Sequence, residues 1–279
     1  MAALTRTRQA PAGAARGTGR RRRRLPVWRW AVLLLAAVYF LLPLWGALRF
    51  AGISAFGGVA GQPGFTTSLW LSARLAVVTT AITLALMVPT TAYVHLRLPR
   101  LHRVLDSVTI LPVVIPPVVL IIGVLKVAPS ALKASPYLLA LEYVILAMPF
   151  AYRSIDAGLR ALDLKTLTEA AGSLGAGWGA TLWRVVLPNL TTALLSAVVL
   201  TVALVLGEYT MATLDLYTTF PVWIVVNDQV SAQGSVASSL LALFVTWLVL
   251  MLITMAGTRR SRRRGGGGVT LFTTAAPGR

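Results

Sequence analysis

Long apolar segments separated by polar connections dominate the chain. Six of them are long enough to cross a bilayer as helices, because about 20 apolar residues span its hydrocarbon core. They occupy residues 28–48, 66–95, 104–126, 137–159, 190–212 and 236–257. The second is longer than a bilayer requires, so we expect it to tilt or to extend beyond the membrane. The pattern predicts an all-α integral membrane protein with six transmembrane helices.

The composition agrees with this pattern and excludes several classes of protein. Hydrophobic residues make up 57% of the 279 positions and charged residues only 12%, about half of what a soluble domain carries. A water-soluble chain of this length could not bury so many apolar side chains, which excludes an ordinary soluble enzyme, a secreted domain and a disordered regulator. The sequence has no cysteine, so disulfides, thiolate metal sites and a cysteine nucleophile are excluded too.

Basic residues are concentrated on alternate connections between the spans. With the N-terminal arm in the cytoplasm, 22 of the 26 basic residues lie inside, Arg49, Lys126 and Lys133 lie outside, and Arg74 lies within a span. This distribution obeys the positive-inside rule and predicts that both termini are cytoplasmic. The net charge of +18 therefore reflects topology, and we expect no nucleic-acid partner. The run from Arg20 to Arg24 could bind nucleic acid, but an anchor on anionic membrane lipids is the simpler interpretation.

The same pattern divides the chain into four parts. Residues 1–27 form a basic cytoplasmic arm and residues 259–279 a basic cytoplasmic tail, and we expect both to be disordered. Residues 28–65 hold the first transmembrane helix and an outer loop, and residues 66–258 hold a core of five transmembrane helices. The first apolar segment has the composition of a signal peptide, but its length and its flanking tryptophans favour a retained span.

The cytoplasmic connection at residues 160–189, called the long loop below, differs from the others in length. Thr166 and Glu169 are spaced as a capping box, which predicts a helix that begins near Thr166. Glycines from Gly172 onward interrupt that helix, and an amphipathic piece follows before Pro188 marks the turn into the fifth span. The loop either docks a short small-residue helix into a partner or merely connects two spans.

The long loop resembles the EAA loop of permease subunits in bacterial binding-protein-dependent ATP-binding-cassette importers of the type I, MetI-like family. That family's pattern is Glu-Ala-Ala, three residues, Gly, nine residues, Ile, one residue, Leu, Pro. Every spacing agrees, and the one difference is Val185 in place of Ile. The resemblance covers residues 66–257 and implies the MetI-like fold. It assigns docking of a cytoplasmic ATPase to Glu169, Ala170, Ala171, Gly172, Gly175, Leu187 and Pro188.

The resemblance also implies a set of partners. They are two ATPase subunits, a second permease subunit that is identical or homologous, an external solute-binding protein and the lipids of a bacterial inner membrane. The sequence has no Gly-x4-Gly-Lys-Ser/Thr phosphate loop, so we expect ATP to bind to the ATPase subunits and this chain to bind no cofactor. No catalytic or metal site is expected. The two histidines, His95 and His102, belong to a basic cytoplasmic connection.

Prolines in the third span indicate a wall of a translocation pathway. Pro116 and Pro117 remove two backbone donors and break the helix, and a broken backbone at membrane depth survives only inside protein or beside water. Similar proline clusters occur in this span of the importer permeases. A static kink used for packing is the alternative.

Two carboxylates inside spans, Glu208 and Glu142, are further candidates for the pathway, because ionisable groups there are usually functional. Tyr209, which can stack or hydrogen-bond beside Glu208, is a candidate too. Glu208 could instead lie at the outer end of its span, wetted by water or paired with the second permease. The sequence Gly207-Glu208-Tyr209 resembles permeases for ferric ion, thiamine, aminophosphonates and polyamines, and implies a solute of that class. Arg74 more simply anchors its helix at the interface.

Two other classes of protein remain as alternatives. A secondary transporter or channel without ATPase would need intramembrane charges to couple ions, and only Glu208, Glu142 and Arg74 qualify. It would leave the spacing of the long loop unexplained. A membrane scaffold or sensor would predict a soluble signalling domain.

At the inner end of the fourth span, Asp156 is spaced from Arg153 and Arg160 for an ion-pair ladder.

Overall fold

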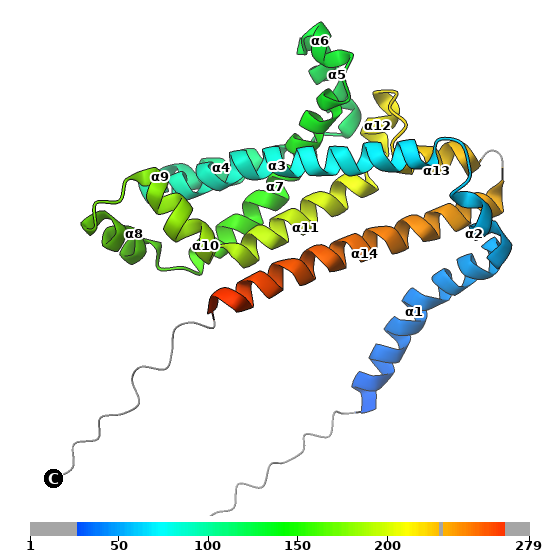
Figure 1. The fold of residues 1–279 in the computed structure, drawn as a ribbon, viewed down its shortest axis with the longest axis horizontal. Coiled ribbons are helices and arrows are strands. Elements are labelled where there is room, and N and C mark those ends of the chain that lie inside the picture. Colours follow the sequence, from blue (N-terminus) through cyan, green and yellow to red (C-terminus); the bar gives the residue numbers. More distant parts are fainter. Residues whose placement is uncertain (1–26, 229–230, 266–279) are drawn as a thin grey trace, which may run out of the picture. The chain divides into compact units, whose positions relative to one another are not determined.

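The computed structural model describes residues 27–228 and 231–265, and this part of the chain contains helices and no strand (Figure 1). The predictions for the basic run and for most of both ends lie outside the described residues. In chain order the elements are α1 (Val27–Ala51), α2 (Ile53–Val59), α3 (Phe65–Arg97), η1 (Pro99–Leu101), α4 (His102–Val114), α5 (Pro117–Val127), α6 (Ser130–Lys133), α7 (Tyr137–Arg160), α8 (Leu164–Ser173), α9 (Trp178–Thr181), the π-helix η2 (Leu182–Val186), α10 (Leu187–Asn189), α11 (Thr191–Gly207), α12 (Thr210–Leu214), α13 (Phe220–Asp228) and α14 (Ala232–Gly265).

Four of the described helices are long and apolar enough to cross a membrane: Trp28–Ala51, Phe65–Arg97, Tyr137–Arg160 and Ala232–Gly257. Two bent pairs raise the number to six if each counts as one span. The first pair joins α4 to α5 and the second joins the α9–α10 segment to α11. The chain is thus an all-helical membrane protein with four to six candidate spans. The count of six and the cytoplasmic termini stay predictions.

Helix α14 corrects one predicted boundary. It continues to Gly265, so residues 259–265 are helical where a disordered tail was predicted. Helix α1 is apolar on all sides, with Leu34 and Phe40 both exposed, as expected for a helix that lipid surrounds. Its residues up to Gly46 form a unit separate from the rest of the chain.

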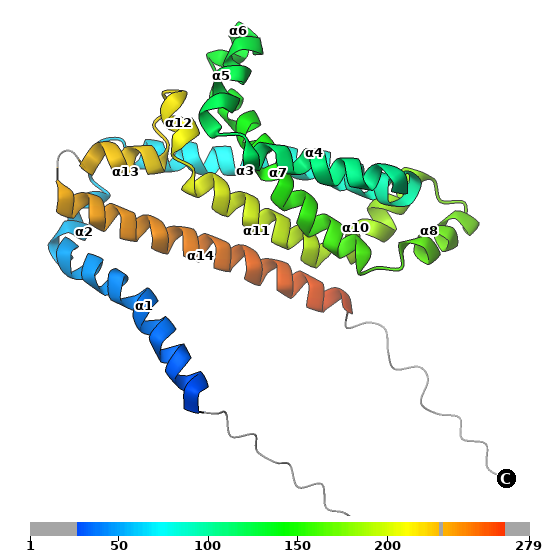
Figure 2. The same cartoon turned by 180° about the vertical axis from the view of Figure 1, so that it is seen from behind.

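The centre of the larger unit is formed by α3, α7 and α11, which pack against one another, while α14 lies along α11 and α13 (Figures 1 and 2). Small residues allow this close packing, as in many membrane helix pairs. Thr79 on α3 is fully buried and donates to the carbonyl of Ala140 at 3.2 Å. A Cβ atom at Gly158 of α7 would lie only 2.4 Å from Ala193 Cβ of α11, so glycine is required for this approach.

The long loop is anchored in the hydrophobic core at one end of this bundle. Leu182, Val186 and Leu190 are at most 6% exposed and belong to the same buried cluster as Tyr152 and Ile155 of α7. The loop therefore does not hang freely from the two helices that it connects. Its position is fixed by apolar burial, which leaves α8 to project at this end of the bundle (Figures 1 and 2).

The connection between α11 and α14 is packed at the opposite end of the bundle. Phe220 and Trp223 of α13 are buried, and both rings contact Phe65 edge to face. The Trp223 indole donates to the carbonyl of Pro63 at 2.9 Å, and the Phe220 N–H donates to Ser72 Oγ at 2.8 Å. This connection thus contains a short helix, α13, that packs against α3 and α14.

Candidate functional site

Helix α8 of the long loop begins at Leu164 with Asp163 as its N-cap, three residues before the cap at Thr166 that the capping box predicts. The Asp163 carboxylate accepts from the Thr166 N–H at 3.3 Å and from the Thr166 hydroxyl at 2.7 Å. The predicted cap at Thr166 is therefore wrong, because Asp163 offers a carboxylate at the preferred distance in sequence from that N–H. The hydrogen bonds from Thr166 also lower the pKa of Asp163. Glu169 is consequently free of any capping role.

The other end of α8 is fixed by Gly175. Its φ of 77° lies in the left-handed region, which residues with a Cβ adopt only at a cost. The Gly175 N–H donates to the carbonyl of Gly172 at 2.9 Å, and the Ala176 N–H to that of Ala171 at 3.0 Å. These bonds satisfy carbonyl groups that a helix end leaves without partners. Of the predicted helix-breaking glycines, Gly172 lies inside α8 and Gly175 ends it.

The predicted docking residues divide between an exposed face and a buried face. Glu169, Ala170, Gly172 and Gly175 are exposed, whereas Ala171 is 8% exposed. Leu174, which follows α8, is 88% exposed. An apolar side chain so exposed beside a small-residue helix is suited to burial in a partner's groove.

The second half of the long loop contains the predicted Leu187 and Pro188, both half-buried in α10. Pro188 has no N–H and its ring displaces the carbonyl one turn earlier. The preceding residues accordingly form a π-helix, in which the Leu187 N–H donates to the carbonyl of Leu182. The chain then bends by 78° into α11, as the proline predicted. Trp183 on this segment is 71% exposed.

A cavity of about 630 Å³ lies between α8 and the end of α3. Glu169 and Lys165 line it from α8, Trp178 from α9 and His95 from α3. The indole of Trp178 also contacts Tyr93 of α3 edge to face. The long loop therefore contacts α3 directly, near the end of that helix at Arg97.

The predicted break in the third span is present. Helix α4 ends at Val114, α5 begins at Pro117, and the two are bent by 102°. Pro116 is exposed and Pro117 occupies the first turn of α5, where a missing N–H costs no hydrogen bond. The two prolines thus break the helix at positions where no N–H of their own is left unpaired, and whether they line a pathway stays a prediction.

Glu208 lies at the end of α11, at the break before α12, and not inside a continuous helix to residue 212 as predicted. Its carboxylate accepts from the Met211 N–H at 3.0 and 3.1 Å and from the Ala212 N–H at 3.5 Å. The side chain therefore caps α12. Tyr209 beside it is 39% exposed. The role of both residues in a pathway stays a prediction.

Glu142 lies inside the protein. Its side chain is fully buried, and neither carboxylate oxygen has a hydrogen-bond partner among the described residues. The neighbouring carboxylate is Asp215, whose two oxygens are also buried without a partner there. Burial raises the pKa of Asp215. This pair could not be predicted from the sequence, since the two residues are far apart along the chain.

Comparisons with known proteins identify the family. No protein-family model matches the chain. A probable molybdenum ABC transporter permease protein of Haloferax volcanii is 31% identical over 195 residues, which cover 65% of this chain and 72% of the relative. The molybdenum transport system permease protein ModB of Mycobacterium tuberculosis is 28% identical over 247 residues, which cover 81% of this chain and 93% of the relative.

A solved structure shares the fold. It belongs to a bacterial alginate ABC transporter in complex with a periplasmic protein bound to an alginate pentasaccharide. The similarity has a TM-score of 0.64 at 16% sequence identity and covers 87% of this chain and 96% of the matched chain. At that identity the similarity establishes the arrangement of helices and nothing about the solute.

Proposed function

The chain belongs to the permease family of ATP-binding-cassette importers, and from that premise we propose that it forms half of the pathway for a tetrahedral oxyanion of the molybdate type. The observation that carries the solute class is the similarity to two molybdenum permeases at 28% and 31% identity. In oxygenated neutral water molybdenum is present as the molybdate dianion. The expected class of ferric ion, thiamine, aminophosphonate or polyamine is the alternative that the experiments below must exclude.

We propose that α8 docks to the ATPase. Support comes from its geometry: a short helix with a side-chain cap at Asp163 and a left-handed glycine at Gly175 is held rigidly at both ends. Its exposed face carries Glu169 and Ala170, and the exposed Leu174 follows it. Because Leu182 and Val186 anchor the same loop in the core, a push on α8 would be transmitted to α3, α7 and α11.

The proposed assembly contains two ATPase subunits, a second permease and an external solute-binding protein, in a bacterial inner membrane. A second permease is supported by the exposed apolar side chains near the break between α4 and α5. Val114, Val119 and Ile122 are 72%, 58% and 56% exposed, and either lipid or a partner subunit must cover them. Their concentration at a broken helix favours protein, because lipid cannot satisfy an irregular backbone.

The carboxylates in the spans do not contradict an anionic solute. Glu208 directs its oxygens at the backbone N–H groups of α12, and Glu142 is fully buried. An anion in the pathway would therefore meet neither group as a bare, solvent-facing charge. Substituting Glu208 with Gln should weaken the cap of α12 but leave the choice of solute unchanged. A changed preference in that variant would instead support the predicted pathway role.

Uptake in cells tests the solute class. A strain that lacks its own molybdate importer should regain uptake of labelled molybdate when it carries this chain with its ATPase and binding protein. Unlabelled tungstate should compete because it has the same shape and charge, whereas spermidine, thiamine, ferric citrate and an aminophosphonate should not. Competition by one of those four solutes, with none by tungstate, would refute the oxyanion proposal in favour of the alternative class.

Two substitutions test the docking role. Because Asp163 and not Glu169 caps α8, Glu169→Gln leaves the helix intact and removes only the charge. We expect weaker co-purification of the ATPase and lower uptake in that variant, whereas Lys133→Gln, on the far side of the membrane in the predicted topology, should match the wild type. Uptake that continues with a catalytically inactive ATPase would instead support a secondary transporter or channel.

A further inference from the structure

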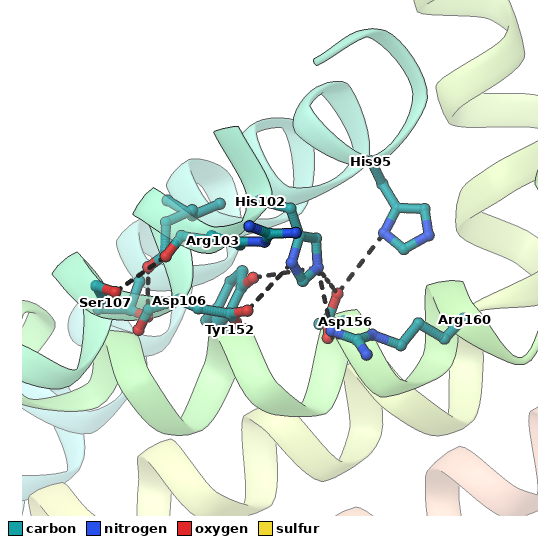
Figure 3. Close-up of polar contacts among 10 residues, drawn as sticks. His95, His102, Arg103, Asp106, Ser107, Tyr152, Asp156 and Arg160 are labelled. Carbon is teal, nitrogen blue, oxygen red and sulfur yellow. Dashed lines mark hydrogen bonds and ion pairs between the residues drawn. The ribbon is translucent and has the colours of Figure 1, made fainter. Parts of the chain in front are cut away.

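Two histidines and an aspartate meet where α3, α4 and α7 approach one another (Figure 3). His102 Nε2 lies 2.8 Å from Asp156 Oδ1, and His95 Nδ1 lies 3.6 Å from the same oxygen. One ligand atom from each residue falls within 4.8 Å of the other two. The sequence predicted the pairing of Asp156 with Arg160, which is present at 2.8 Å, but left the histidines in a connecting loop.

We propose that His95, His102 and Asp156 form a binding site for one transition-metal dication of the zinc class. A tetrahedral zinc ion holds nitrogen and oxygen ligands at about 2.0–2.1 Å, which places neighbouring ligand atoms about 3.3 Å apart. The observed separations lie on both sides of that value, so small side-chain movements suffice. Two imidazoles with one carboxylate favour zinc, cobalt or nickel over magnesium and calcium, which prefer oxygen ligands.

One donor atom of the cluster lacks a hydrogen bond, and the other two, His102 Nε2 and Asp156 Oδ1, form a hydrogen bond with each other that an ion would replace. His95 Nδ1 is buried and has no hydrogen-bond partner among the described residues, so its orientation towards Asp156 satisfies no hydrogen bond. Asp156 Oδ2 is held by Arg160 Nε at 2.8 Å, which leaves Oδ1 facing both imidazoles. A carboxylate bound through one oxygen would thus keep its contact with Arg160.

The second nitrogen of His102 is also positioned. Its Nδ1 lies 3.1 Å from Asp106 Oδ2, the arrangement in which a carboxylate fixes the ring orientation of a metal-bound histidine. Tyr152, whose hydroxyl is 3.5 Å from His102 Nε2, closes the site on the side of α7.

Arg160 opposes the ion. Its Nη2 lies 3.3 Å from His102 Nε2, where a guanidinium would repel a dication. The side chain is 58% exposed, so this arm can turn into solvent. Removing its charge should therefore increase the affinity for the ion.

The location of the cluster offers the ion an access route and would give its binding a structural effect. A cavity of about 560 Å³ lined by Asp106, Tyr152 and Asp156 borders the cluster, and His95 also lines the cavity below α8. An ion bound here would link the inner ends of α3, α4 and α7 beside the long loop. This property is independent of the solute that the permease transports.

Cobalt provides a direct test on the purified full-length chain in lipid nanodiscs. The sequence contains only two histidines, so with a tag free of histidine any imidazole–metal signal comes from this cluster. Titrated Co²⁺ should produce a saturable visible absorption band of a low-coordinate site at one ion per chain, and Zn²⁺ should abolish it. Zn²⁺ should also raise the midpoint of thermal unfolding. Absence of saturable binding in the wild type would overturn the proposal and leave the cluster a charge network.

Variants locate the ion. His95→Asn and Asp156→Asn should each abolish the cobalt band, Asp106→Asn should weaken binding about 10–100-fold, and Arg160→Gln should strengthen it. Asp163→Asn, an exposed acid of the long loop outside the cluster, is the matched control and should bind as the wild type does. If the first two variants fail to fold, Asp106→Asn and Arg160→Gln still decide the matter. Unchanged affinity in both of these would overturn the assignment.

Discussion

Replacement of Gly175 by alanine isolates the contribution of one backbone conformation to ATPase docking. The residue ends α8 with a φ of 77°, and nothing lies within 4 Å of the position a Cβ atom would take. The substitution therefore introduces no steric clash with neighbouring groups. Its whole effect comes from forcing a residue with a Cβ into the left-handed region.

The expected magnitude follows from that strain. An L-residue in the left-handed conformation costs about 1–2 kcal/mol, which corresponds to a factor of about 5–30 in an equilibrium constant. If α8 must end at this turn to fit the ATPase, Gly175→Ala should weaken binding of the ATPase by roughly that factor. Gly175→Asn should weaken it less, because asparagine adopts the left-handed region more readily.

The assay is binding of the purified ATPase to the permease in nanodiscs, together with uptake of labelled molybdate in cells. Gly179→Ala is the control: this glycine lies in the same loop, its Cβ position is also open, and its φ is not positive. Docking through the Gly175 turn is refuted if Gly175→Ala binds the ATPase as tightly as Gly179→Ala. A larger loss for asparagine than for alanine would refute the strain argument.

Three further predictions concern packing, charge and topology. Gly158→Ala should lower the midpoint of thermal unfolding, because overpacking costs about 1–3 kcal/mol, and Ala193→Gly in the same chain should restore it; equal midpoints in the single variant and the wild type would contradict the 2.4 Å approach. Burial raises the pKa of Asp215, so the folded state binds a proton that the unfolded state releases, and this residue destabilises the fold as the pH rises above its unfolded pKa of about 4. Asp215→Asn should therefore stabilise the protein at pH 7.5 and have little effect at pH 4, and an equal shift at both pH values would exclude the ionised carboxylate as the cause. A reporter that is active only in the periplasm, fused after Arg264, should be inactive, and an active fusion would overturn the predicted cytoplasmic C-terminus.

The sequence by itself determined the class of the protein and the position of the break in the third span. Apolar length predicts membrane-crossing helices regardless of how they pack, and the structure places helices at each predicted segment. Pro116 and Pro117 break the third span because a proline ring acts on its own backbone. The spacing from Glu169 to Pro188 indicates the family without any tertiary information, because such a motif is a property of one short segment.

Predictions from the local sequence failed at two helix boundaries, the start of α8 and the end of α11. Thr166 and Glu169 have the spacing of a capping box, in which Glu169 would accept from the Thr166 N–H. In the structure the Asp163 carboxylate accepts from that N–H instead and sets the start of α8. Glu208 was predicted inside a helix that the chain in fact ends at Gly207. In both cases the helix boundary was set by the side chain that accepts hydrogen bonds from the backbone N–H groups. Composition alone could not show which side chain would do so.

Only the tertiary structure decided which distant residues meet. Asp156 lies 54 positions from His102, and the two meet because α4 and α7 pack side by side. The contact of Gly158 with Ala193 and the burial of Glu142 beside Asp215 arise in the same way. These contacts depend on the register and rotation of whole helices, which the sum of many small packing terms sets. No single segment of the sequence contains that information, so the candidate metal site became visible only in the fold.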